Sequence, residues 1–148
     1  MTGDRVAGRT LTMGEVEAGD RLPELAVPIT RTLIVAGALA TRDYEDVHHD
    51  PQRAAERGTP DIYMSINHTN GLVGRYVTDW AGPGAVLTRL STRLGVPNFP
   101  GDTMTLTGEV TAVTASTVSV AVTGTNSKGA HTISEVTLRL PAGPGEAS

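Results

Sequence analysis

The last third of the chain alternates between apolar and polar residues, and this pattern constrains the fold more than any other feature. In "TMTLTGEVTAV" (103–113) the apolar residues share one face of a strand: Met104, Leu106, Val110 and Ala112. "TVSVAVTG" (117–124) alternates in the same way, and "HTISEVTLRL" (131–140) supplies a further strand. The links "TAS" and "NSKG" are short enough for hairpins, so the strands are predicted to pair antiparallel.

A long helix is predicted ahead of these strands. Ser65 is a good N-cap and "AGPG" (81–84) is typical of a helix end, which gives a helix over about 66–81. Its apolar residues form one stripe at helical spacing: Leu72, Val73, Tyr76, Val77 and Trp80. The apolar face of the sheet must be covered by another element, and the helix over about 66–81 is the long helix that the sequence predicts for this purpose. The predicted fold class is therefore α+β, with three or four antiparallel strands in a meander wrapped around one central helix.

Shorter elements precede the long helix. "LAVP" (25–28) is predicted as a short strand, whereas "TRTLIVAGALA" (30–40) fits a strand or a helix on pattern alone. "PQRAAER" (51–57) is predicted as a short helix, because Asp50 is a good N-cap and Gly58 suits the C-terminal stop.

The composition sets further limits. The 148 residues fit a single domain (1–148), with residues 1 to about 20 and 141–148 expected to be loosely ordered tails. The chain contains no Cys, which excludes disulfides, thiolate catalysis and thiolate metal sites. Its net charge of −4 argues against a broad nucleic-acid or anionic-membrane surface. Because there is no signal-peptide core and no apolar run long enough to cross a bilayer, a cytoplasmic location is predicted.

The stretch "ATRDYEDVHHDPQRAAERG" (40–58) concentrates acidic residues around two adjacent histidines. Its conceivable metal ligands are Asp43, Asp46, His48, His49 and Asp50. A metal site is disfavoured, because adjacent histidines point in different directions and no His-x-His or His-x-x-x-His spacing is present. A solvated acidic turn accounts for the composition without any function. A catalytic pair of Asp43 and His48 requires an irregular segment between them, since five positions on a straight helix rotate the second side chain by about 140°.

The run "TRDYEDVHHDPQRAA" (41–55) resembles the hydratase motif of the MaoC-like, R-specific enoyl-CoA hydratases. The positions that match the motif are Asp43, Val47, His48, Asp50, Pro51 and Ala54 or Ala55. Two positions depart from it, because Glu45 and Asp46 stand where the family has Asn and Pro. The family's His-Gly after the short helix corresponds to Met64-Ser65.

The likeness extends over nearly the whole chain, from about residue 14 to residue 140. "VEAGDRLPELAVPITRTLI" resembles the family's lead-in, and "GVPNFPGDTMTLTGEVTAV" resembles its later segment, where Gly-Asp precedes the long strand. "ALATRDYEDVHHD", "GLVGRYVTDWAGP" and "RLGVPNFPGDT" are most similar to the small catalytic subunit of actinobacterial heteromeric hydratases of steroid side-chain degradation.

This resemblance implies a hot-dog fold and the hydration of a trans-2-enoyl-CoA. Asp43 and His48 would activate the water, and the backbone N–H of Ser65 would stabilise the oxyanion of the thioester. No metal and no organic cofactor is expected, because coenzyme A belongs to the substrate. The expected partner is a second, larger MaoC-like subunit without the dyad, in a heterodimer or heterotetramer that accepts a bulky, ring-bearing acyl group.

Other interpretations remain open from the sequence. The chain is alternatively a homodimeric hydratase or dehydratase acting on fatty acyl or polyketide thioesters, or a non-catalytic hot-dog subunit. Ser65 serves equally well as a simple N-cap. We interpret His68 as a satisfied structural histidine, and no motif supports a role for His131 on its late strand. Arg89 and Arg93 alternate on a strand that could meet CoA phosphates, but a solvated strand face is the favoured interpretation.

Overall fold

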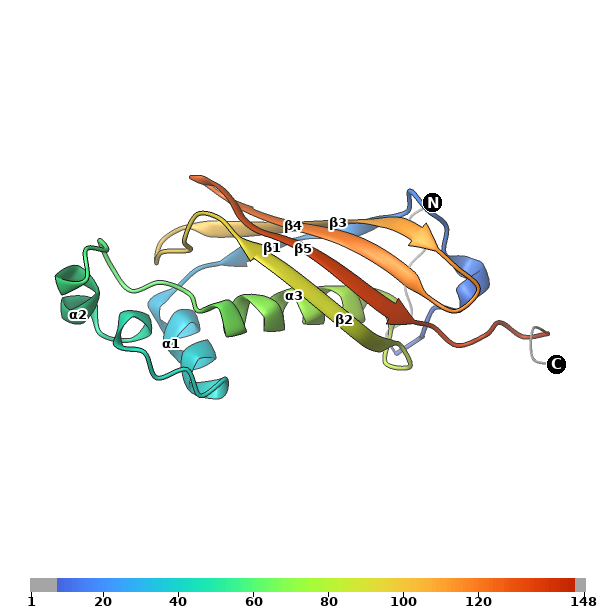
Figure 1. Cartoon of the computed structure of the whole chain (residues 1–148), viewed down its shortest axis with the longest axis horizontal. Helices are drawn as coiled ribbons and strands as arrows, with labels where there is room; N and C mark the ends of the chain where they lie inside the picture. The colour runs from blue at the N-terminus through green and yellow to red at the C-terminus, as the bar shows by residue number, and fades with distance from the viewer. Residues whose placement is uncertain (1–7, 146–148) are drawn as a thin grey trace.

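A five-stranded antiparallel sheet curves over one long helix in the computed structural model, which describes residues 8–145 (Figure 1). The strands are β1 (Arg21–Pro28), β2 (Val86–Leu94), β3 (Thr103–Val113), β4 (Val118–Asn126) and β5 (Gly129–Arg139). The helices are α1 (Arg31–Ala40), α2 (Pro51–Glu56) and α3 (Ile66–Ala81), with short 3-10 turns η1 (Met13–Glu15) and η2 (Asp46–His48). The helix α3 lies against the sheet, whereas α1 lies next to the start of α3 at one end of the molecule and α2 lies further out at the same end (Figure 1).

The helix α3 provides the centre of the core, as its apolar stripe predicts. Val73 and Val77 are completely buried, and they pack with the inward-facing residues of the sheet, such as Val120 and Val136. Ser65 caps α3 as expected, because its hydroxyl oxygen accepts a hydrogen bond from the His68 N–H at 3.2 Å. The α+β arrangement with one central helix is confirmed. The ambiguous segment 30–40 is helical, with Thr30 as its N-cap.

The strand order is β1-β3-β4-β5-β2, which differs in one respect from a simple meander. The strands β3, β4 and β5 follow one another through hairpins, but β2 pairs with β5 instead of β3. One face assignment in β3 is also wrong. A bulge between Val110 and Ala112 shifts the pairing with β4, so that Ala112 is exposed and Val113 packs against the core.

Within the expected tail over 1–20, residues 11 and 13 form hydrogen bonds with distant parts of the chain. The Leu11 N–H donates to the Ala81 carbonyl at the end of α3 (2.8 Å), and the Met13 N–H donates to the Pro141 carbonyl (3.0 Å). These bonds fasten the segment to the end of α3 and to the chain after β5. The first seven residues and the last three lie outside the described part of the chain.

The helix α1 packs against α3 through a glycine. A Cβ atom on Gly37 would collide with the imidazole ring of His68, so this close approach requires a residue without a side chain. Gly71 on α3 has no such neighbour, since nothing lies within 4 Å of its added Cβ. The contact between Gly37 and His68 therefore fixes α1, and the segment that follows it, relative to the start of α3.

No helix within residues 8–145 combines the length and the apolar character that a membrane span requires.

The two glycines predict opposite effects of the same substitution. Gly37→Ala should lower the free energy of unfolding by about 1–3 kcal/mol, because the methyl group overpacks the helix contact. Gly71→Ala should raise it by about 0.5–1 kcal/mol, because Ala is the better helix former and its methyl group meets open space. Chemical denaturation of the two variants measures both. Equal effects of the two substitutions would show that α1 does not pack on His68 in this way.

Candidate active site

The segment between α1 and α2 is irregular in the way that a pair of Asp43 and His48 requires. Arg42 adopts a positive φ of 55°, which turns the chain out of α1. The Asp43 N–H still donates to the Ala38 carbonyl (2.9 Å), so the carboxylate is placed at the end of the helix. The turn η2 then folds the chain back and buries His48 at 7% exposure.

This fold-back brings the two side chains face to face. Asp43 Oδ2 and His48 Nε2 are 3.7 Å apart, which exceeds hydrogen-bond length. The other ring nitrogen of His48, Nδ1, lies 2.7 Å from the Tyr63 carbonyl oxygen. Because a carbonyl only accepts, Nδ1 carries the hydrogen and the lone pair of the neutral ring is on Nε2, facing Asp43. A single water molecule can donate one hydrogen to Nε2 and the other to the carboxylate.

Asp50 has a structural role, as the sequence indicates. Its Oδ1 accepts hydrogen bonds from the N–H groups of Gln52 (3.0 Å) and Arg53 (3.2 Å), which starts α2 immediately after the histidine pair. The neighbouring His49 is exposed. Within residues 8–145, no three His, Asp or Glu side chains are grouped to bind a metal ion, and the absence of a metal from the reaction stays a prediction.

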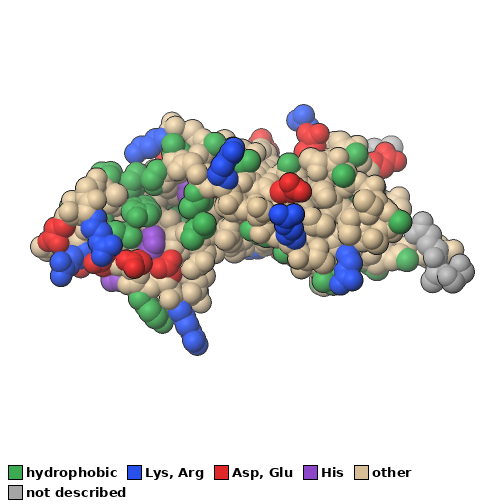
Figure 2. All heavy atoms as spheres, in the orientation of Figure 1, with side chains coloured by type: hydrophobic (Ala, Val, Ile, Leu, Met, Phe, Trp, Pro, Cys, Tyr) green, Lys and Arg blue, Asp and Glu red, His purple; other side chains and the backbone are tan. Residues whose placement is uncertain are grey.

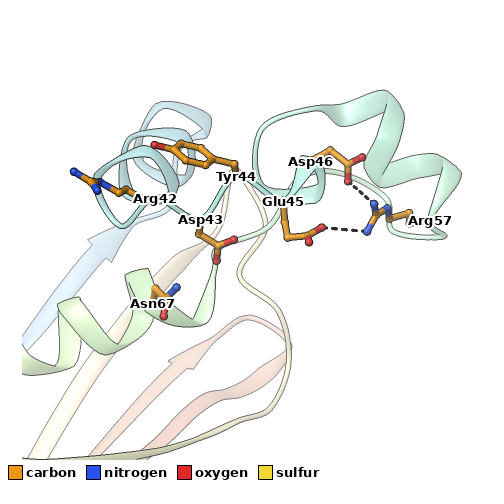
Figure 3. Close-up of a pocket in the computed structure, with 7 residues that line it drawn as sticks. All are labelled: Arg42, Asp43, Tyr44, Glu45, Asp46, Arg57 and Asn67. Carbon is orange, nitrogen blue, oxygen red and sulfur yellow. Dashed lines mark hydrogen bonds and ion pairs between the residues drawn. The ribbon is translucent and has the colours of Figure 1, made fainter.

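Asp43 opens onto a surface pocket of about 530 Å³ (Figure 3). The residues that line it are Arg42, Asp43, Tyr44, Glu45, Asp46, Arg57 and Asn67. Arg57 forms ion pairs with both Glu45 (3.3 Å) and Asp46 (3.1 Å) on the far side of the pocket, which offsets one of their two negative charges. The Asp43 side chain instead points toward the start of α3, where Asn67 lies (Figure 3). At this end of the molecule, hydrophobic side chains lie beside a group of acidic, basic and histidine side chains (Figure 2).

Ser65 lies at the start of α3, two residues after the carbonyl that holds His48. The residue is almost completely buried, at 1% exposure, and its side chain is the N-cap. Among the described residues, its N–H group finds no acceptor, whereas the preceding Met64 N–H donates to the Asn98 carbonyl (3.1 Å). The cap and the oxyanion role are therefore compatible, because one uses the hydroxyl group and the other uses the N–H group.

The remaining histidines differ from one another. Burial lowers the pKa of His68, whose Nδ1 lies against α1 without a hydrogen-bond partner in the described structure. His68 therefore packs between helices as a structural residue, but among the described residues one of its ring nitrogens lacks the hydrogen bond that the sequence-based interpretation implies. Burial also lowers the pKa of His131, while its bond to the Val96 carbonyl opposes that shift. Arg89 and Arg93 lie exposed on β2, in agreement with a solvated strand face.

Sequence reasoning missed Tyr63, Thr69 and Asn98. Tyr63 and Asn98 contribute through their backbone carbonyls, which leave no trace in a residue pattern. Thr69 and Asn98 are polar residues with 0% exposure. The position of Thr69, a polar residue within the apolar stripe of α3, is the sequence feature that could have indicated a buried polar contact.

The fold and this constellation define a member of a known family. Residues 14–131 match the family model of the MaoC like domain, and the chain belongs to that family. Its fold is the hot-dog fold of this family.

Two of the similar proteins share about half of their sequence with this chain, and a third shares its fold. The chain is 48% identical, over 122 residues, to the 3-oxo-4,17-pregnadiene-20-carboxyl-CoA hydratase beta subunit of Mycobacterium tuberculosis, covering 82% of this chain and 95% of the relative. It superposes with a TM-score of 0.83 on a chain in the crystal structure of the ChsH1-ChsH2 complex from the same organism, at 48% identity and covering 84% and 98% of the two chains. The R-hydratase PhaJ1 from Pseudomonas aeruginosa has the same fold at 20% identity (TM-score 0.82, covering 90% and 88%).

Proposed function

We propose that the protein is the catalytic subunit of a heteromeric enoyl-CoA hydratase, which adds water to a trans-2-enoyl thioester. The observation that carries this proposal is the pair of Asp43 Oδ2 and His48 Nε2, 3.7 Å apart with the imidazole tautomer set by the Tyr63 carbonyl. Both groups are acceptors, so they bind one water through its two hydrogens and direct its oxygen lone pair outward.

The proposed reaction balances without any further reagent. The water oxygen bonds to the β-carbon of the enoyl group, and its proton passes to the Asp43–His48 pair. The π electrons move onto the thioester, which becomes an enolate. The pair then returns a proton to the α-carbon from the same face, so that H and OH add syn and the pair regains its starting state.

The enolate oxygen requires stabilisation by a hydrogen-bond donor. The Ser65 N–H stands at the start of the 16-residue helix α3, where the helix dipole favours negative charge. A preorganised backbone N–H in a buried position acts on the charge as it develops and needs no reorganisation.

The relatives support the proposed substrate and partner. The M. tuberculosis relative is named for a steroid-derived acyl-CoA, and the solved structure of that organism is a two-component complex. We extend both to this chain: a bulky steroid side-chain enoyl-CoA as substrate and a second, larger MaoC-like subunit as partner. Near Asp43 the surface is open, and Tyr44, which lines the pocket, is exposed; Leu39 at the end of α1 and Ile66 at the start of α3 are exposed as well. A large apolar acyl group needs a more enclosed site, which a partner subunit would complete. A cytoplasmic location is part of the same proposal.

The assembly is tested by assaying hydration with the chain alone and co-purified with a candidate large MaoC-like subunit. The substrates are a short linear enoyl-CoA and a steroid side-chain enoyl-CoA, and loss of the enoyl absorbance is followed. We expect activity in the complex with the steroid substrate. Activity of the chain alone on the linear substrate would instead identify a homodimeric hydratase, and no hydration in any combination would support a non-catalytic subunit.

The dyad is tested in the same complex by Asp43→Asn and His48→Gln. Each should reduce kcat by roughly 10²–10⁴-fold, because each replaces a group that can take a proton from the water by an amide, which accepts a hydrogen bond but does not take up the proton. The matched control is His49→Gln, which changes the adjacent, exposed ring and should retain the wild-type rate. Thermal unfolding of each variant checks that the fold is kept. A wild-type rate in either dyad variant would refute the assignment.

A further inference from the structure

His131 is a buried histidine that the proposed reaction does not use. It is 2% exposed, and both of its ring nitrogens have partners. Nδ1 lies 2.7 Å from the Val96 carbonyl oxygen, and Nε2 lies 2.9 Å from the hydroxyl oxygen of Thr69. The ring therefore bridges the loop that follows β2 and the first turn of α3.

Each of these two contacts is connected to Ser65 by further hydrogen bonds. On the helix side, Thr69 approaches the Ser65 carbonyl with both its N–H group (3.0 Å) and its hydroxyl group (3.2 Å). On the loop side, the Asn98 carbonyl, two residues after Val96, accepts the Met64 N–H. The peptide that carries the Ser65 N–H is thus held from the peptide before it and from the peptide after it.

The contacts close into a ring of buried polar groups. The residues that form it are Ser65, Met64, Asn98, Val96, His131 and Thr69. Buried polar groups are costly unless they are satisfied, and a satisfied network fixes one geometry where apolar packing tolerates several. The Nδ2 group of Asn98 also contacts the sulfur of Met104 (3.2 Å), which anchors the loop side to β3.

The numbers of donors and acceptors determine which group donates in each of these hydrogen bonds. The Val96 carbonyl accepts, so His131 Nδ1 carries the hydrogen, and in the neutral ring Nε2 accepts from the Thr69 hydroxyl. Burial favours this neutral form, because it lowers the pKa of His131. The Thr69 hydroxyl gives its one hydrogen to His131, so the Ser65 carbonyl accepts its hydrogen bond from the Thr69 N–H (3.0 Å) and not from the hydroxyl group. Thr69 is the residue in which the two halves of the ring meet.

We propose that Thr69 and His131 are positioning residues for hydration, which hold the Met64–Ser65 peptide so that the Ser65 N–H is aimed at the thioester oxygen. The inference rests on the proposed function of the Asp43–His48 site. His48 is tied to the same segment, because its Nδ1 donates to the Tyr63 carbonyl. This ring of hydrogen-bonded residues therefore sets the distance between the Asp43–His48 pair, which activates the water, and the Ser65 N–H, which stabilises the negative charge on the thioester oxygen.

The test uses Thr69→Val in the purified hydratase complex, with Thr69→Ser as the conservative variant. Thr69→Val keeps the side-chain shape and removes the hydroxyl, so it should lower kcat by about 10- to 100-fold with KM nearly unchanged, as a misplaced oxyanion donor does. Thr69→Ser keeps the hydroxyl and should restore most of the lost rate. The matched control is Ser134→Ala, which removes a buried hydroxyl bonded to Thr92 (2.8 Å) and Thr132 (3.0 Å) on the sheet. It should lower the Tm without lowering kcat.

A spectroscopic readout separates positioning from general loosening of the fold. The infrared carbonyl stretch of a bound, saturated acyl-CoA should lie at lower frequency in the wild type and in Thr69→Ser than in Thr69→Val, because the Ser65 N–H polarises that carbonyl. Equal kcat losses in Thr69→Val and Ser134→Ala would overturn the positioning role, and so would a carbonyl band at the same frequency in Thr69→Val and the wild type. Neither result would contradict hydration by the wild type or the assignment of the Asp43–His48 pair. Absence of hydration in the wild-type complex would instead overturn the proposed function, and this inference with it.

Discussion

The hydrogen bond between His48 Nδ1 and the Tyr63 carbonyl, at 2.7 Å, is the interaction on which the site depends. It fixes the tautomer, and so it leaves the lone pair of Nε2 directed at Asp43. It also connects His48 to the short strip Tyr63–Ser65, which ends at the cap of α3. The base and the oxyanion donor are therefore parts of one rigid segment, although seventeen positions separate His48 from Ser65 in the sequence.

That segment is rigid because neighbouring elements hold it on every side. The Tyr63 N–H donates to the Val47 carbonyl (3.2 Å), and the Met64 N–H donates to the Asn98 carbonyl (3.1 Å). At its far end, Ser65 caps α3 with its hydroxyl. The core gives these contacts a fixed frame, because α3 is packed against the curved sheet along its apolar stripe. A site of this kind gains rate from preorganisation, since its dipoles do not reorient during the reaction.

Much of the fold is predictable from the sequence, because its determinants are local. The N-cap Ser65 and the breaker at 81–84 give the bounds of α3, and alternation gives the positions of the strands. The pairing of β2 with β5 is not predictable in this way, because it depends on contacts between distant segments. The bulge after Val110 also escapes a strict alternation, and it reverses the faces of Ala112 and Val113.

The site, like the fold, has features that the sequence predicts and features that depend on contacts in the folded chain. A resemblance to a family motif selected Asp43 and His48, but their spacing in sequence does not bring them together. Their approach depends on the positive φ of Arg42 and on the turn η2, which are properties of the folded chain. Tyr63 and Asn98 act through carbonyl groups that every residue possesses. The sequence therefore indicates which side chains carry the chemistry, whereas the structure is needed to see what orients them.

The central claim is that one water, held on one face of the enoyl group by Asp43 and His48, supplies both the hydroxyl and the proton. The most direct test is hydration in D₂O by the active complex, followed by assignment of the relative configuration of the product by NMR. The account predicts a single diastereomer with one α-deuterium added on the same face as the β-hydroxyl group. An anti product, or a mixture of α-epimers, would contradict it.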